Sequence, residues 1–231
     1  MADSANRTAT WIRDVPRFPG PSPDLETESR ALTALLPPCK ISGMDSPTAM
    51  PITVPVLTAP HVRLRPFRRD DAAWVYYVSL DPELRRNLSL PDPYLHSHAR
   101  YFVDHIALAA ARDGQGADFA IEDPETEIAL GWVGIHRTEG NEVSCGFWLA
   151  ADVRGRGLMT LALHAACRWA LTPAPDGLGT GIVHWNAHVG NHASRAVAEH
   201  VGFTIHSDTV PGRSGPKWAG HLLLGNLHSA G

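Results

Sequence analysis

A glycine-rich turn that runs directly into an amphipathic helix is the stretch of this sequence best suited to chemistry. The turn is Arg154-Gly155-Arg156-Gly157, and the apolar positions of the helix pattern continue to Trp169. Glycine lets a backbone approach its ligand closely, and the first N–H groups of a helix have no partner within it. The helix dipole and two guanidinium groups add attraction for negative charge. The stretch therefore predicts a diphosphate site.

A second polar pair opens the helix pattern that runs from Asn191 to His200. Asn191 can cap this helix, because its side-chain oxygen can accept a hydrogen bond from an N–H group of the first turn. Ser194 lies one turn further on the same face, so its hydroxyl could protonate a leaving group. The same hydroxyl could equally bond the backbone of its own turn. Both interpretations of Ser194 stay open.

The hydrophobic pattern predicts the elements that must position these residues. Strands are expected at residues 62–65, 118–122, 127–136, 142–149 and 180–187, with a last sheet portion from Phe203 that includes residues 218–224. Helices are expected from Asp70, over residues 97–112, after the glycine turn and over residues 191–200. The three strands between residues 118 and 149 would form an antiparallel meander. The strand, glycine turn, helix and strand that follow form a βαβ unit, so residues 142–149 and 180–187 should lie parallel and adjacent.

Composition narrows the class of protein. The 231 residues, 44% of them hydrophobic, suit one soluble domain with or without an arm. A net charge of −4 with scattered arginines argues against a nucleic-acid surface. Cys39, Cys145 and Cys167 lack the spacing of a metal knuckle, and an odd number of cysteines fits a reducing compartment. No segment matches a signal peptide or a membrane helix, so a cytoplasmic protein without metal or membrane contact is expected.

The first 58 residues differ from the rest of the chain. Prolines punctuate polar sequence there, which disfavours helices and sheets alike. We therefore expect residues 1–58 to be a flexible proline-rich arm, or an over-long start with Met44 or Met50 as the initiator, and residues 59–231 to be the functional domain.

Three of these motifs together resemble the GNAT N-acetyltransferases, in particular their RimJ/RimL-like branch. Residues 154–159, RGRGLM, resemble the acetyl-CoA signature [Q/R]xxGx[G/A]. Residues 191–203 resemble the element NxxSxxVxxxxGF, and residues 62–66 followed by Asp70-Asp71 resemble the opening of that branch. The resemblance covers about residues 59–228, with the motifs in the right order and spacing.

The resemblance implies a mixed α/β fold, with a strongly twisted mixed sheet that splits at the cofactor strand and has helices on both faces. It implies acetyl-CoA as co-substrate and no metal. The implied cofactor-binding residues are Phe147, Trp148, Leu149, Arg154, Gly155, Arg156, Gly157, Leu158, Met159, Thr160, Asn191 and Ser194. Those of the strand and turn would act through backbone groups, with the Leu149 N–H meeting the acetyl oxygen. Ser194 would also protonate the departing CoA thiolate.

This sequence departs from the family pattern in its catalytic groups. Met159 stands where the signature has glycine or alanine, and Ala198 and Asn186 stand where the RimI-like branch has its tyrosine acid and glutamate base. The base is therefore open between Glu142, at the start of the cofactor strand, His184, on the same strand face as Asn186, and a water chain. His188 would share that face if the strand continues.

The expected function is transfer of an acetyl group to a primary amine, of a protein N-terminus or a small molecule, by direct attack in a ternary complex. A buried position for Cys145 and Cys167 argues against a covalent intermediate. One alternative is another acyl donor such as succinyl-CoA, which would need Arg63, Arg65 or Arg137 near the acyl group. Another is a catalytically weak acyl-CoA-binding module. The acidic balance favours a cationic acceptor, residues 88–98 should border its site, and an exposed final strand could be the edge of a homodimer.

Overall fold

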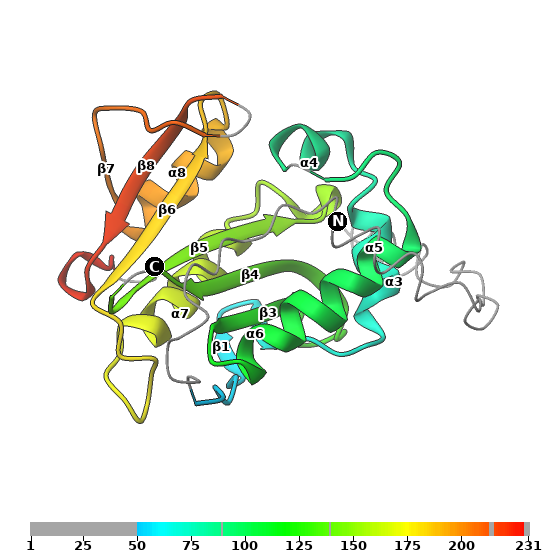
Figure 1. Ribbon diagram of the computed structural model, residues 1–231, viewed down its shortest axis with the longest axis horizontal. Helices are drawn as coiled ribbons and strands as arrows, with labels where there is room; N and C mark the ends of the chain where they lie inside the picture. Colours follow the sequence, from blue (N-terminus) through cyan, green and yellow to red (C-terminus); the bar gives the residue numbers. More distant parts are fainter. Residues whose placement is uncertain (1–49, 89, 139, 213–214, 229–231) are drawn as a thin grey trace, which may run out of the picture. The chain divides into compact units, whose positions relative to one another are not determined.

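An eight-stranded mixed sheet organises the protein (Figure 1). The computed structural model describes residues 50–88, 90–138, 140–212 and 215–228. In sheet order the strands are β1 (Leu57–Ala59), β2 (Val62–Pro66), β3 (Gly116–Glu122), β4 (Ala129–Arg137), β5 (Glu142–Leu149), β6 (Ile182–His188), β8 (Lys217–Leu222) and β7 (Thr204–Ile205). Every neighbouring pair is antiparallel except β5 and β6. The predicted meander and the parallel crossover are both confirmed.

The parallel pair β5–β6 is joined at one end only. Its register couples Glu142 with Ile182 and ends at Ser144 with His184, although both strands continue for several residues. Beyond that point the strands diverge, as Figure 1 shows, and their facing backbone groups have no ladder partner there. The split expected from the family resemblance therefore lies between β5 and β6.

One face of the sheet is apolar and is covered by two helices. Alternate residues such as Val133, Ile135, Val143 and Val183 are fully buried on it. They pack in one core with α7 (Leu158–Leu171), and α8 (His192–Val201) contacts α7. The long hydrophobic stripe of α7 thus holds the strands on both sides of the split in place.

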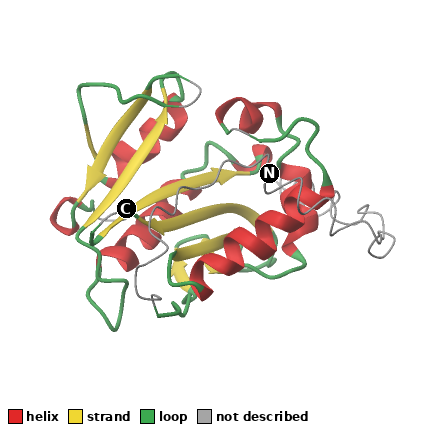
Figure 2. Ribbon diagram, in the orientation of Figure 1, coloured by secondary structure: helices red, strands yellow, loops and turns green. Residues whose placement is uncertain are grey.

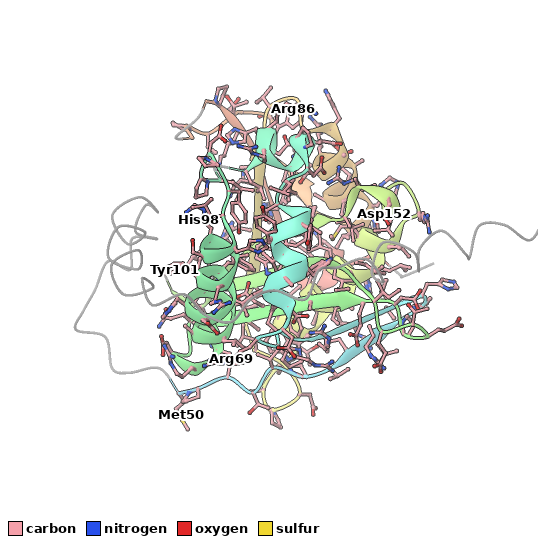
Figure 3. All side chains as sticks on the ribbon, turned by 90° about the vertical axis from the view of Figure 1, so that its right-hand side faces the viewer. Met50, Arg69, Arg86, His98, Tyr101 and Asp152 are labelled. Atoms are coloured by element: carbon pink, nitrogen blue, oxygen red, sulfur yellow. The ribbon has the colours of Figure 1, made fainter. Side chains whose placement is uncertain are left out.

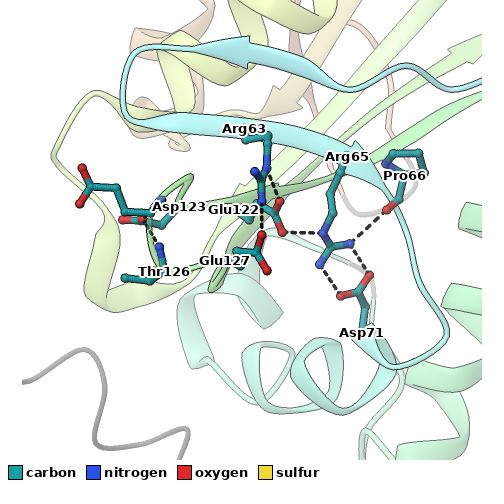
Figure 4. A network of polar contacts seen from close by, with 9 residues as sticks. Arg63, Arg65, Pro66, Asp71, Glu122, Asp123, Thr126 and Glu127 are labelled. Atoms are coloured by element: carbon teal, nitrogen blue, oxygen red, sulfur yellow. Dashed lines mark hydrogen bonds and ion pairs between the residues drawn. The ribbon is translucent and has the colours of Figure 1, made fainter.

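The opposite face carries polar side chains. Over β2 to β4 it is covered by α3 (Asp71–Val78) and by α5 (His96–Tyr101), which continues through a π-helical turn (Phe102–Ala107) into α6 (Leu108–Arg112). Figure 2 shows helices on both sides of the strands. Arg65 on this face pairs with Glu122 and Asp71, and Arg63 pairs with Glu122 and Glu127 (Figure 4). This network fastens β2, β3 and α3 together.

Several predicted boundaries need correction. The boundary at residue 58 falls inside β1, and Ile52 and Val54 before it already pack against the core. Helix α4 (Pro82–Asn87) was not predicted, although Asp81 caps it by accepting from the Glu83 N–H at 2.9 Å and proline stands at its first position. The last strand, β8, is not an edge, because the two-residue β7 pairs with its outer side. The rest of the predicted arm lies outside the described residues.

Candidate active site

A cavity of about 630 Å³ occupies the split between β5 and β6. Its wall comes from seven places: α4 with Leu88, Trp132 on β4, the last half of β5, the glycine turn with the start of α7, the last half of β6, α8 with its N-cap, and Lys217 on β8. In Figure 3, Arg86 on α4 lies at the top and Asp152, shortly before the glycine turn, lies at the right. The two motifs that the sequence singled out therefore meet at one cavity.

The glycine turn has the conformation that the sequence predicts. Gly155 and Gly157 have φ angles of 74° and 75°, in the left-handed region where a side chain is strained. Gly157 is the N-cap of α7, and no side chain in the described chain caps the helix there. Its first N–H groups are therefore available to an anion. Gly155, Gly157, Leu158, Met159 and Thr160 line the cavity, and Met159 also belongs to the buried core.

The side chains of the two arginines of the turn have hydrogen-bond partners within the protein. Arg156 is not part of the cavity wall, and its Nη2 donates to the carbonyl of Asp152 at 3.0 Å. Arg154 borders the cavity, but its Nη1 donates to Glu83 at 2.9 Å, its Nη2 pairs with Asp81, and its Nε donates to the Leu149 carbonyl at 3.1 Å. All sides of this guanidinium are used. Arg154 thus ties α4 to the cofactor strand, and a contact of either arginine with the diphosphate stays a prediction.

The backbone of β5 alternates between the two neighbouring strands. Ala150 donates to the Leu130 carbonyl at 2.9 Å, so its backbone points toward β4. Alternation turns the backbone of Phe147 and Leu149 toward the split and that of Trp148 toward β4. Trp148 lines the cavity with its backbone turned toward β4, so we expect any contact with the cofactor to come from its side chain, and its predicted role in cofactor binding stays a prediction.

Asn191 and Ser194 serve the local structure and also line the cavity. The side-chain oxygen of Asn191 accepts from the Ser194 N–H at 3.1 Å, which confirms the predicted N-cap. The Ser194 hydroxyl accepts from the indole Nε1 of the buried Trp185 at 3.1 Å. Because an indole N–H only donates, the hydrogen of this hydroxyl is left to point elsewhere. The hydroxyl hydrogen of Ser194 is thus available as a donor beside the cavity.

The candidate bases lie at different depths. Glu142 and His184 bond each other, with Oε2 and Nε2 2.7 Å apart, at the closed end of the split, and neither lines the cavity. His188 and Asn186 line it directly. All of them except Glu142 lie on β6, on the polar face of the sheet, because Trp185 between them is buried on the other side. Strand β6 continues to His188, so the condition set for that candidate is met, and the choice of the base stays a prediction.

A tryptophan forms part of the floor. The Trp132 indole lies across two glycines, because Cβ atoms at Gly134 and Gly146 would stand 2.4 Å and 3.0 Å from it. Its Nε1 donates to Asp118 at 2.7 Å, and His136 bonds the same oxygen at 3.1 Å. Burial alone would lower the pKa of His136, but the hydrogen bond and charge of Asp118 outweigh it and raise the pKa. These partners fix the floor rigidly.

Sequence reasoning missed part of the wall because it depends on distant contacts. Leu88 belongs to the loop expected to border the acceptor site. The lining residues to which the sequence gave no binding role are Glu83, Leu84, Asn87, Trp132, Cys145, Gly146, Trp185, Ala187, Ala193, Ala196, Val197, His200 and Lys217. Only α4 has a local signal, the Asp81-Pro82 start. In the described ranges there is no cluster of three or more residues able to hold a metal ion, and no helix there is long and apolar enough to span a membrane.

Comparison with known proteins agrees with this architecture. The structure of Mycobacterium smegmatis RimJ in complex with CoA-disulfide matches with a TM-score of 0.60 and 23% identity over 75% of this chain and 88% of that one. A structure of RimL, a ribosomal L7/L12 alpha-N-protein acetyltransferase, with coenzyme A matches with a TM-score of 0.62 and 17% identity over 74% and 98%. An acetyltransferase from Agrobacterium tumefaciens matches with a TM-score of 0.61 and 23% identity over 77% and 99%. At these identities the likeness concerns the fold.

Sequence comparison gives the family. A protein of Bacillus subtilis (strain 168) named "Putative ribosomal N-acetyltransferase YdaF" is 36% identical over 75 residues, which is 32% of this chain and 39% of that relative. The chain thus spans well under half the length of that relative. The model of the acetyltransferase (GNAT) domain matches residues 61–204, which include the glycine turn and both strands of the split. The chain belongs to the GNAT acetyltransferase family.

Proposed function

We propose that this protein transfers the acetyl group of acetyl-CoA to a primary amine, by direct attack in a ternary complex. The observation that carries the proposal is the single cavity in which a glycine turn, an open helix N-terminus and the unpaired backbone of two diverging strands meet. A diphosphate and an extended amide chain are the two parts of CoA that such groups would bind.

The cofactor would bind entirely through backbone and uncharged groups. The N–H groups of Gly155, Gly157 and residues 158–160 would hold the diphosphate, as at other helix N-termini. The backbone N–H and C=O of Phe147 that face the split would pair with the pantetheine amides as a further strand does, whereas the Leu149 carbonyl already accepts from Arg154. The Leu149 N–H would then bond the acetyl oxygen and stabilise the charge that develops there.

Ser194 would act as the acid for the leaving thiolate. Its hydroxyl lines the cavity, and the bond accepted from Trp185 leaves its hydrogen free. Asn191 at the same helix end would bond the pantetheine arm while it caps α8. The cap and the cofactor contact are compatible, because an amide side chain has both an acceptor and donors.

The amine proton would leave through water along the polar face of β6. Glu142 accepts from His184 Nε2, which leaves Nδ1 of the same ring as an acceptor, and both side chains are more than a third exposed. A water between the cavity and this pair would pass the proton to His184, with Glu142 as the positioning residue. Cys167 is fully buried, and burial raises the pKa of its thiol. Cys145 lines the cavity but is only 7% exposed, so a covalent acetyl-cysteine is not part of the proposal.

The acceptor class follows from the relatives. One relative is named a putative ribosomal N-acetyltransferase, and another is a ribosomal L7/L12 alpha-N-protein acetyltransferase. We infer for this chain an N-terminal amine of a protein as the first class to test. A succinyl donor loses its support from the three arginines, because Arg63 and Arg65 are held in the network of Figure 4 and Arg137 Nε donates to the Gly114 carbonyl at 3.2 Å.

The test is acetyl transfer to a panel of peptides with free N-termini and of small amines. Thiol release and the mass of each product would be followed with the native protein and with Gly157→Val. Acetylation of a panel member by the native protein alone supports the proposal. Tight binding of acetyl-CoA without acetylation of any amine would instead establish the second alternative, a module that binds acyl-CoA without turnover.

A further inference from the structure

Lys217 brings a positive charge into the cavity that no carboxylate of the described residues neutralises. Two other lining side chains are formally charged at neutral pH, Glu83 and Arg154, and they pair with each other. The Lys217 Nζ donates instead to the neutral side-chain oxygen of Asn186 at 3.0 Å. A cation next to a substrate cavity without its own counter-ion is suited to an anionic group of the ligand.

The surroundings of Lys217 direct its side chain. Its backbone N–H and C=O both bond Val210 at 2.9 Å, and its strand position faces His188 on β6. Gly212 lies along its aliphatic stem, and a Cβ at that glycine would come within 2.9 Å of both Cγ and Cε of the lysine. The stem is therefore held between the strand and Gly212, and the head is held by Asn186. Only two residues of the whole sequence, Lys40 and Lys217, are lysines among 20 basic residues.

The side of the sheet separates this charge from the CoA phosphates. Lys217 and Asn186 are diagonal neighbours on the adjacent strands β8 and β6, and both side chains lie on the polar face. Helix α7, which follows the glycine turn, covers the apolar face. Asn186 turns its oxygen to Lys217, which leaves its Nδ2 hydrogens free to donate beside the ammonium. One ammonium and one amide suit a carboxylate, because each of its two oxygens can accept from one of these donors.

We propose that Lys217, with Asn186, binds a carboxylate of the substrate within the cavity. This inference rests on the proposed acetyl transfer and narrows its acceptor to an amine that carries a nearby carboxylate, in place of the cationic acceptor that the overall charge suggested. The same carboxylate chemistry could come from the acyl group of a dicarboxylic acyl-CoA. The two sources are distinguished by the experiment.

The experiment compares matched anionic and neutral substrates. The acceptor pairs are the peptides Asp-Ala-Ala amide and Asn-Ala-Ala amide, and phenylalanine and its amide; the donor pair is succinyl-CoA and acetyl-CoA. Acceptors are measured by kcat/KM with acetyl-CoA and by calorimetric binding to the CoA-loaded protein, and donors by calorimetric binding. We expect the anionic member of one pair to be favoured by about tenfold, the size of one charge-assisted hydrogen bond.

Variants assign the preference to the lysine. Lys217→Met should bring the ratio to about one while acetyl-CoA affinity is kept, and Lys217→Arg should retain a preference. Gly212→Ala should displace the lysine stem and reduce the preference, whereas Gly225→Ala, where a Cβ meets open space, should not. A preference that survives in Lys217→Met, or equal use of both members of all three pairs by the native protein, would overturn the proposal.

Failure of the transferase function gives a different result. In that case no amine is acetylated. The CoA-loaded protein would still bind the anionic acceptor more tightly than its neutral partner, or the free protein would still bind succinyl-CoA more tightly than acetyl-CoA. The Lys217→Met variant would lose this preference. This outcome would keep the carboxylate site and remove the acetyl transfer. Loss of both the transfer and the binding preference would remove both.

Discussion

The Ser194 hydroxyl combines a packing role with a candidate catalytic one. It accepts the hydrogen bond of a buried indole and at the same time lines the cavity. The sequence could place Ser194 one turn after Asn191, but the partner Trp185 lies on a strand, and its orientation depends on how α8 packs. Local spacing therefore predicted the residue, and tertiary structure decided which hydrogen bond it makes.

Ser194→Ala separates the two roles. We expect a fall in kcat of about 100-fold, the lower end for a lost general acid, with little change in acetyl-CoA affinity. The free energy of unfolding should also fall by about 1–3 kcal/mol, because Trp185 Nε1 loses its acceptor. Adding Trp185→Phe removes the unpaired indole N–H, at the cost of a cavity in the core, and should recover none of the rate. If it recovers the rate, Ser194 only supports the packing.

Asp118 should make stability depend on pH through His136. The pKa of His136 is raised in the folded protein, so the pair stabilises the fold fully below the unfolded pKa of about 6.5, and this contribution is lost as the pH rises through the higher folded value. Asp118→Asn keeps an oxygen for the Trp132 indole but removes the charge. Urea unfolding should show a larger loss of stability for this variant at pH 6 than at pH 9. An equal loss at both values would show that His136 is not charged there.

At the scale of elements, the strands were largely predictable and the small helix at the cavity was not. Period-two alternation located the strands because each has one face in the core. The clamp made by Arg154 was not predicted, since the sequence shows this arginine on the turn but cannot show its partners Glu83 and Asp81, 71 and 73 residues away. The same limit hid Lys217, whose contact with Asn186 depends on the pairing of β6 with β8.

Arg154→Met tests whether this arginine is a clamp or a cofactor ligand. Its pairs with Asp81 and Glu83 and its bonds to the Leu149 carbonyl hold α4 against the cofactor strand. We expect a loss of about 1 kcal/mol or more in stability. Faster hydrogen exchange should appear in α4, with acetyl-CoA affinity changed only slightly. Lost affinity with unchanged exchange in α4 would restore Arg154 as a ligand of the cofactor.

At the scale of the whole molecule, the domain begins earlier than composition suggests. Ile52 donates to the Ala111 carbonyl at 2.8 Å, and β1 extends the sheet by three residue pairs. Prolines around these residues masked a short edge strand, which tolerates such neighbours.

Two truncations test this boundary. A protein that starts at Met50 should keep the midpoint of thermal unfolding of the full chain. One that starts at Pro60 should lose about 2 kcal/mol or more, because it exposes the core that Ile52, Val54 and Leu57 cover. Equal stability of the two truncated proteins would return the boundary to residue 58.

The central claim is that the split between β5 and β6, with the glycine turn at its side, is an acetyl-CoA site. Calorimetric titration of acetyl-CoA into the native protein and into Gly157→Val tests it most directly, with circular dichroism to show that the variant is folded. A side chain at a φ of 75° would distort the turn and occupy the space of the diphosphate. The account predicts one bound acetyl-CoA per native chain and an affinity at least about 100-fold weaker in the variant, the equivalent of roughly 2.7 kcal/mol. Absence of binding to the native protein, or equal affinity in a folded variant, would contradict it.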